Sequence, residues 1–267
     1  MHPHGFFKFG TLLFLLNSAL AAASDEEKSP AVSFDTFPLP VKRFYVFSNP
    51  GTPVAKALEM NSPFPDDFPP NTAVYLEDLR SYPSLEKGPR YMMTARNVLR
   101  VFNISGMKTA PYETIQSSVK ELRALLKARS AVLKHREDKG QNEARFPDYP
   151  SRNAGHLVEV KPSFVDAPWG SGFFYVTRFV QGIGEWPDNE TLVYLLQGLS
   201  KDGRYYVSAD FRITHPALEH AKPANDSNEE ADKLTEKLGA LLAKERDDSF
   251  TPSLKKIRDW AATLKIE

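Results

Sequence analysis

The chain has 267 residues, of which 41% are hydrophobic and 25% are charged, an ordinary globular composition that suits one main domain. Its 34 basic and 34 acidic residues give a formal net charge of zero, which excludes a global electrostatic attraction to nucleic acid or to anionic membranes. Cysteine is absent, so disulfides, thiol catalysis and cysteine metal sites are excluded as well.

The first 23 residues have the pattern of a secretory signal peptide. Lys8 precedes the short apolar run Thr11–Leu16, and small residues at Ala21–Ala23 mark the expected cleavage region. The run is far shorter than the roughly 20 apolar residues that a membrane span needs, and no later stretch is long enough. We therefore expect a secreted or periplasmic protein with no transmembrane segment in its mature chain. Removing residues 1–23 leaves 33 basic and 34 acidic residues, a net charge of −1.

The mature chain is predicted to begin with a polar, disordered lead-in at residues 24–30, followed by a single domain at residues 31–267. Aromatic and β-branched residues predict strands at 43–48, 73–77, 91–95 and 98–103. Four prolines between residues 61 and 71 predict a loop there, because proline interrupts both helices and central strands.

From residue 112 the apolar period changes to that of a helix. Ile115, Val119, Leu122 and Leu126 form one stripe, which predicts an amphipathic helix at residues 112–129 that packs on a sheet. The charged run at residues 134–143 indicates a solvated loop, and residues 156–160 resume strand character.

The stretch from Gly172 to Thr214 contains three apolar runs separated by turn residues, the pattern of a three-stranded antiparallel meander. Asp202 and Gly203 fit a type I′ turn, which sets the register of the hairpin around them. The predicted pairs are Leu196 with Ala209, Tyr194 with Phe211, Gln197 with Ser208, and Leu195 with Asp210. Residues 173–180 are apolar on both faces, so we expect this strand to be covered on both sides.

Two helices are predicted after the meander. The first, at residues 227–246, begins with a capping box of Ser227 and Glu230. The second, at residues 252–265, begins with Thr251 as cap and Pro252 in the first turn. The predicted fold is therefore α+β, an antiparallel sheet of about five to seven strands packed by one central and two C-terminal helices.

The meander resembles a family of exported bacterial proteins of uncharacterised function. The residues that carry the resemblance are Tyr175–Thr177, Leu195–Leu199, Asp202–Gly203 and Tyr205–Ala209. Members often pair such a segment with a leucine-rich helix before it and a Phe-Thr-Pro-Ser-Leu motif near the end, and this chain has Phe250–Leu254. The resemblance implies export and a common fold, but no catalytic residues. Relatives commonly have a lipid-attachment cysteine after the signal; its absence here favours release in soluble form.

Candidate catalytic and metal-ligating groups are sparse. His215 and His220 are five residues apart, but Pro216 intervenes and no HExxH helix is present, so we predict no metal site. No G-x-S-x-G motif or phosphate-binding glycine loop occurs. Glu185, Asp188 and Glu190 cluster beside Trp186, a pattern that glycosidases use and that solvated loops also show.

One face of the meander is predicted to be solvated and to carry polar side chains. Gln197, Asp210 and Arg212 lie on it, and Arg178 is expected to join them. The alternative is that a helix covers this face, in which case its polar residues need partners or line a cleft. Trp169 and Trp186 lie outside the predicted strands and are candidates for a contact surface.

The sequence thus favours an exported, soluble, non-enzymatic binding domain with no catalytic residues and no cofactor. Its binding residues are predicted to be Arg178, Gln197, Asp210, Arg212, Trp169 and Trp186, and its partner a protein or a small ligand outside the cytoplasm, not nucleic acid. The alternative function is an extracytoplasmic hydrolase that acts through carboxylates or through His156 with Asp210.

Overall fold

The computed structural model of the protein describes residues 30–34, 45–49, 71–76, 97–105, 113–129, 146–150, 154–225 and 227–267. The predicted signal peptide, the strand predicted at residues 91–95 and the loop predicted at residues 134–143 lie outside these residues. So does the proline-rich loop, apart from Asn71 at its end. Within the described part of the chain, no helix is long and apolar enough to cross a membrane.

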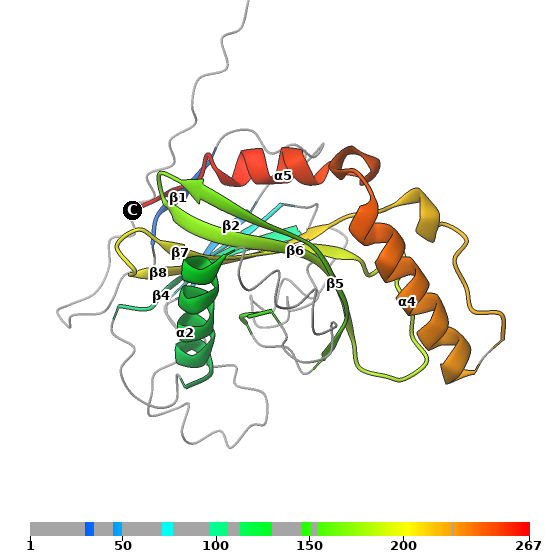
Figure 1. The fold of residues 1–267 in the computed structure, drawn as a ribbon. Helices are drawn as coiled ribbons and strands as arrows, with labels where there is room; N and C mark the ends of the chain where they lie inside the picture. Colours follow the sequence, from blue (N-terminus) through cyan, green and yellow to red (C-terminus); the bar gives the residue numbers. More distant parts are fainter. Residues whose placement is uncertain are drawn as a thin grey trace, which may run out of the picture.

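The described core is a seven-stranded sheet in which every neighbouring pair is antiparallel (Figure 1). With helices packed on it, this sheet confirms the α+β class. The strands of the expected meander are neighbours within it. In spatial order the strands are β2 (Tyr45–Asn49), β3 (Asn71–Tyr75), β4 (Asn97–Asn103), β8 (Tyr205–Arg212), β7 (Val193–Ser200), β6 (Gly170–Val180) and β5 (Gly155–Ala167).

The register of the β7–β8 hairpin is the predicted one: all four predicted pairs, from Tyr194 with Phe211 to Gln197 with Ser208, are present. The predicted turn type is wrong. A type I′ turn needs positive φ at both central residues, whereas only Gly203 has it, at 71°. The amide of Gly203 donates to the carbonyl of Ser200 at 2.9 Å, so one glycine in the left-handed region closes the turn without changing the register.

Strand β5 is much longer than the segment predicted at residues 156–160. It runs through Pro162 with register shifts between His156 and Glu159 and between Val160 and Ser163. Lys161, within the second shift, has a φ of 57°. Proline lacks an amide donor, but an edge strand with a bulge tolerates it, because the missing hydrogen bond is not needed there.

One face of the sheet, here called the α5 face, carries Phe174, Leu196 and Ala209. It is covered by α4 (Asn228–Lys244) and α5 (Leu254–Ala261), whose buried residues join the same apolar cluster (Figure 1). The Ser227 hydroxyl accepts from the amide of Glu230, which is one of the two hydrogen bonds of the predicted capping box. The Ser227 amide donates to Asn225 Oδ1 instead of to the Glu230 side chain.

The last helix is shorter than predicted, and its cap is Ser253 rather than Thr251. Thr251 instead exchanges backbone hydrogen bonds with Thr214. Lys265–Ile266 is not helical: it forms strand β9, which pairs with β1 (Val32–Ser33). Pro30, at the end of the predicted lead-in, is buried, and its carbonyl accepts from the Thr72 hydroxyl at 2.5 Å.

The opposite face, here called the α2 face, carries Phe173, Leu195 and Tyr206. Helix α2 (Glu113–Ala128) lies on it and buries Ile115, Val119 and Leu122, as the helical stripe indicated (Figure 1). The fourth buried residue is Leu125 rather than the predicted Leu126, which is half-buried. Phe146 and Tyr149, from the segment at residues 146–150, pack beside the helix. The prediction of a solvated sheet face is therefore wrong, because elements from earlier in the chain cover it.

Candidate functional site

The predicted binding residues do not form one surface. Gln197, Asp210, Arg178 and Trp169 are buried, Trp186 is half-buried, and Arg212 is exposed at the end of β8. The predicted exposure of Gln197 and Asp210 followed from the two-residue alternation, which assigns a residue to a face but does not say whether that face is covered. Trp169 and Trp186 were predicted at the surface because they lie outside the predicted strands. The binding role of these residues stays a prediction.

Gln197 is the centre of a buried hydrogen-bond network on the α2 face. Its Oε1 accepts from the Tyr149 amide at 2.9 Å and from the Tyr206 hydroxyl at 2.5 Å. Its Nε2 donates to the Ser208 hydroxyl at 3.1 Å. Burial also raises the pKa of Tyr206 well above its usual value, so this hydroxyl remains a donor. Gln197 thus holds residues 146–150 against β7 and β8.

Asp210 lies two residues along β8 from Ser208 and is only 4% exposed. It is opposite Leu195 on β7 and Val98 on β4. His156 is on β5, and β6 and β7 lie between the two strands. Three strand spacings separate β5 from β8 by roughly 14 Å, so the sheet does not bring the predicted pair of His156 and Asp210 together.

The indole nitrogens of Trp169 and Trp186 both donate hydrogen bonds to backbone carbonyls of the same chain. Trp169 Nε1 donates to the Ala261 carbonyl at 2.8 Å, and its ring packs on Gly198, where a Cβ would approach it to 2.6 Å. Trp186 Nε1 donates to the Ala221 carbonyl at 2.9 Å. Trp169 is therefore a core residue, and Trp186 ties the β6–β7 loop to the segment before α4; neither forms an open aromatic surface.

Arg178 brings together two of the acidic residues singled out in the sequence. Its guanidinium lies 2.6 Å from a Glu185 oxygen and 3.2 Å from an Asp188 oxygen. The second oxygen of Asp188 accepts from the amides of Glu190 and Thr191, both at 2.8 Å. A glycosidase pair needs one carboxyl to give a proton and the other to attack or activate water. Here the two carboxylates share one cation and fix the β6–β7 loop.

His156 lies between two carboxylates that the sequence analysis did not single out. Its Nδ1 is 2.5 Å from Glu159 Oε1 and its Nε2 is 3.4 Å from Asp148 Oδ2, with the imidazole only 3% exposed. Burial alone lowers the pKa of His156, but hydrogen bonds to Asp148 and Glu159, and their charges, outweigh it and raise the pKa above 6.5. In a regular strand, residues three apart such as His156 and Glu159 point to opposite faces and do not touch. The bulge between them brings the two side chains into contact.

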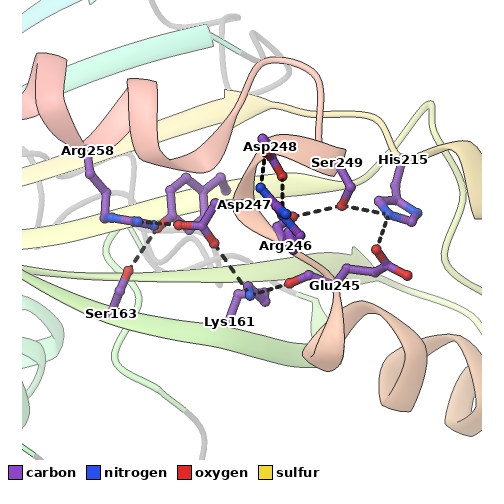
Figure 2. Close-up of polar contacts among 10 residues, drawn as sticks. Lys161, Ser163, His215, Glu245, Arg246, Asp247, Asp248, Ser249 and Arg258 are labelled. Atoms are coloured by element: carbon purple, nitrogen blue, oxygen red, sulfur yellow. Dashed lines mark hydrogen bonds and ion pairs between the residues drawn. The ribbon is translucent and has the colours of Figure 1, made fainter.

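Figure 2 shows a second polar cluster, between β5, α5 and the short helix η5 (Asp247–Ser249). Asp247 pairs with Arg258, and Lys161 Nζ lies 3.4 Å from its other oxygen. Arg258 also donates to the Tyr194 hydroxyl at 2.8 Å. Burial raises the pKa of Tyr194 to about 12, so the tyrosine stays protonated. These contacts join η5 and α5 to the sheet.

His215, also in Figure 2, does not form a catalytic triad. Its Nδ1 accepts from the Ala217 amide at 3.2 Å, which leaves the proton on Nε2. Nε2 faces both Ser249 Oγ, at 3.1 Å, and Glu245 Oε2, at 3.6 Å. A triad requires the serine and the acid on different ring nitrogens. Among the described residues, no group of three or more His, Cys, Asp or Glu side chains could hold a metal ion.

The outer side of α2 carries a different kind of feature. Lys120, Arg123 and Lys127 are exposed and recur at intervals of three and four residues, so they lie on one side of the helix. Lys201, in the β7–β8 turn, is exposed as well, and Arg123 reaches that turn: its Nη2 is 3.5 Å from where a Cβ on Gly203 would lie. These four residues are here called the basic surface. Within the described part of the chain, none of them makes an ion pair.

The neighbouring Arg129 does not belong to the basic surface, because it makes a two-pronged ion pair with Asp166 at 2.8 and 2.6 Å. Hydrogen bonds from Arg129 and from Ser171 lower the pKa of Asp166 to about 2. The sequence analysis missed the basic surface because it considered only the apolar stripe of the helix at residues 112–129. The three-and-four spacing of the cations was the available signal.

Comparisons with protein-family models, with curated proteins and with solved structures give no match for this chain. The geometry described above therefore carries the functional argument.

Proposed function

We propose that the protein is an exported, soluble binding domain without catalytic activity, related to the exported bacterial proteins that its meander and its Phe250–Leu254 motif resemble. One observation carries the proposal: among the described residues, positive charge without an ion-pair partner is gathered on the basic surface, whereas the candidate site residues of the interior bond to other parts of the fold. Gln197, His156 and Arg178 each have their partners within the fold. Interior polar residues thus stabilise the scaffold, and recognition is assigned to the exterior.

The contacts of the candidate bases argue against the hydrolase alternative. A general base needs a free lone pair within hydrogen-bond reach of a nucleophile. Each ring nitrogen of His156 faces a carboxylate, and Nδ1 of His215 is engaged by a backbone amide. Ser249 donates its own proton to the Arg246 carbonyl at 2.7 Å, so it is not prepared for attack.

Export is tested by expressing the full chain in a bacterium with two membranes and separating the compartments. We expect the periplasmic fraction to contain a protein whose intact mass lacks about the first 21 to 23 residues, as the signal pattern predicts. A full-length protein that remains in the cytoplasm would contradict export.

The absence of catalysis is tested with chromogenic ester, glycoside and phosphate substrates. We expect no turnover by the purified protein. Turnover that is lost in His156→Gln or in Glu185→Gln, with circular dichroism unchanged, would overturn the binding proposal in favour of the hydrolase. The Lys256→Gln variant, altered at an exposed residue of α5, is the matched control.

A further inference from the structure

The cations of the basic surface on α2 follow the axis of the helix. With a rise of 1.5 Å per residue, Lys120, Arg123 and Lys127 place three cations within about 10.5 Å along the axis of α2. Lys201 adds a fourth cation in the β7–β8 turn, which Arg123 reaches at Gly203. On α4 and α5, Lys233 pairs with Glu229 and Glu230, and Lys255 pairs with Asp259. Lys237, Lys244 and Lys256 are exposed as well, so what distinguishes α2 is that its three cations recur at intervals of three and four residues on one side of a helix. The basic surface therefore has a local positive potential although the whole chain is close to neutral.

The surroundings of the basic surface narrow the choice of partner. The exposed large hydrophobic side chains of the described residues are Val46 and Ile183, neither of which lies on α2 or in the β7–β8 turn. Among the described residues, α2 and the β7–β8 turn thus offer no exposed aromatic ring on which a nucleic-acid base could stack, and no large exposed apolar side chain that could insert into a bilayer. What remains is electrostatic attraction to a broad anionic surface.

We propose that the basic surface docks reversibly onto anionic phospholipid headgroups. This inference rests on the proposed binding function and names its partner. Each Lys or Arg held close to an anionic leaflet increases partitioning by roughly fivefold. The electrostatic potential is screened over a Debye length of about 8–10 Å. Attraction to an anionic leaflet therefore depends on the local charge of α2, and the neutral remainder of the chain does not cancel this attraction.

The test is sedimentation of the purified mature protein with vesicles. One set contains phosphatidylglycerol in phosphatidylcholine, and the other contains phosphatidylcholine alone. We expect binding to the anionic vesicles at low salt, a steady loss of binding as sodium chloride increases, and no binding to the neutral vesicles. The combined variant Lys120→Glu, Arg123→Glu and Lys127→Glu should bind at least about 100-fold more weakly.

The matched control is the combined variant Lys237→Glu, Lys244→Glu and Lys256→Glu. It changes the net charge by the same amount at exposed positions of α4 and α5. We expect it to retain anionic-vesicle binding within about threefold of the wild type. Equal loss in both variants would overturn the proposal, because net charge alone would then explain binding. Thermal unfolding of each variant shows whether it is folded.

Two further outcomes would overturn the lipid assignment. The first is equal binding to neutral vesicles. The second is release from anionic vesicles by inorganic phosphate at constant ionic strength, which would mean that free phosphate is the ligand. If the protein does not bind anionic vesicles but the export and substrate assays give their expected results, the lipid inference is wrong and the proposed function stands. If the substrate assays detect turnover by His156, the proposed function itself fails.

Discussion

On the α5 face of the sheet the buried cluster is mainly apolar, built from residues such as Phe174, Leu196 and Ala209, and the hydroxyl of its Tyr194 bonds to Ser163 and Arg258. The α2 face combines aromatic rings with buried polar residues, among them Gln197 and Ser208. An apolar face needs only close packing, whereas a buried polar group costs free energy unless a partner is held in the right place. We infer from this difference that packing on the α5 face contributes mainly to the free energy of unfolding. The buried hydrogen bonds of the α2 face determine which segment of the chain can pack on that face.

The largest expected effects come from removing one phenylalanine from each face. Phe173 and Phe174 are adjacent on β6, fully buried, and point to opposite faces. Phe173→Ala and Phe174→Ala should each lower the free energy of unfolding by about 3–5 kcal/mol, because each loses buried apolar area and leaves a cavity. Urea denaturation measures both values.

The control for this pair is Ile183→Ala, since Ile183 is 85% exposed and its removal should change stability by less than about 0.5 kcal/mol. If Phe173→Ala lowered the free energy of unfolding by less than about 1 kcal/mol while Phe174→Ala lowered it by about 3–5 kcal/mol, as expected, the α2 face would not be a second core.

A smaller effect is expected from the polar network of the α2 face. Gln197→Leu keeps similar volume but leaves the Tyr149 amide, the Tyr206 hydroxyl and the Ser208 hydroxyl without this partner. We expect a loss of about 2–4 kcal/mol in the free energy of unfolding, because each stranded buried group costs about 1–3 kcal/mol and part of that cost is relieved by rearrangement. The same urea experiment measures it.

Ser208→Ala removes a single hydrogen bond of the same network and should cost about 1 kcal/mol. If Gln197→Leu were neutral or stabilising, the two faces would be energetically equivalent, and the comparison drawn above would be wrong.

The smallest effect is a pH dependence that originates at His156. On every described element packed against it, the groups facing the imidazole are Asp148, Glu159, Tyr175 and Phe179. Its folded pKa is raised, so its stabilisation is fully present below the unfolded value of about 6.5 and is lost as pH rises through the folded value. We expect the urea midpoint to decrease as the pH rises above about 6.5.

His156→Gln should flatten this slope, because the titrating group is gone. His220→Gln should leave it unchanged, since His220 is exposed. A slope that persists in His156→Gln would assign the pH dependence to another group, and the ion pairs on both sides of the imidazole would then have no role in holding residues 146–150.

Some elements could be predicted because their determinants are close together in the chain. The β7–β8 register follows from alternation across one short turn, so even the wrong turn type left Tyr194 opposite Phe211. The cap at Ser227 and the buried stripe of α2 depend on residues within one or two helical turns.

The misplaced site residues share one physical cause, which is contact with residues distant in sequence. Gln197 was assigned to a solvated face because nothing nearby shows that Tyr149, 48 residues earlier, covers it. Trp169 was assigned to the surface, but its hydrogen bond is to Ala261, 92 residues later. The contact of His156 with Glu159 is local in sequence and has a different cause: it depends on a bulge, which regular strand alternation does not predict.

The sequence by itself determined the α+β class, the faces of the meander, the positions of the main helices and the spacing of the cations on α2. All of these follow from local periodicity, which backbone geometry imposes on neighbouring residues. Only the tertiary structure decided that both faces of the sheet are buried, that the candidate bases are bonded internally, and that Lys201 joins the cations of α2. Packing between segments distant in sequence determines which side chains are buried and which polar groups pair. Local periodicity does not specify which distant segment packs on a given face.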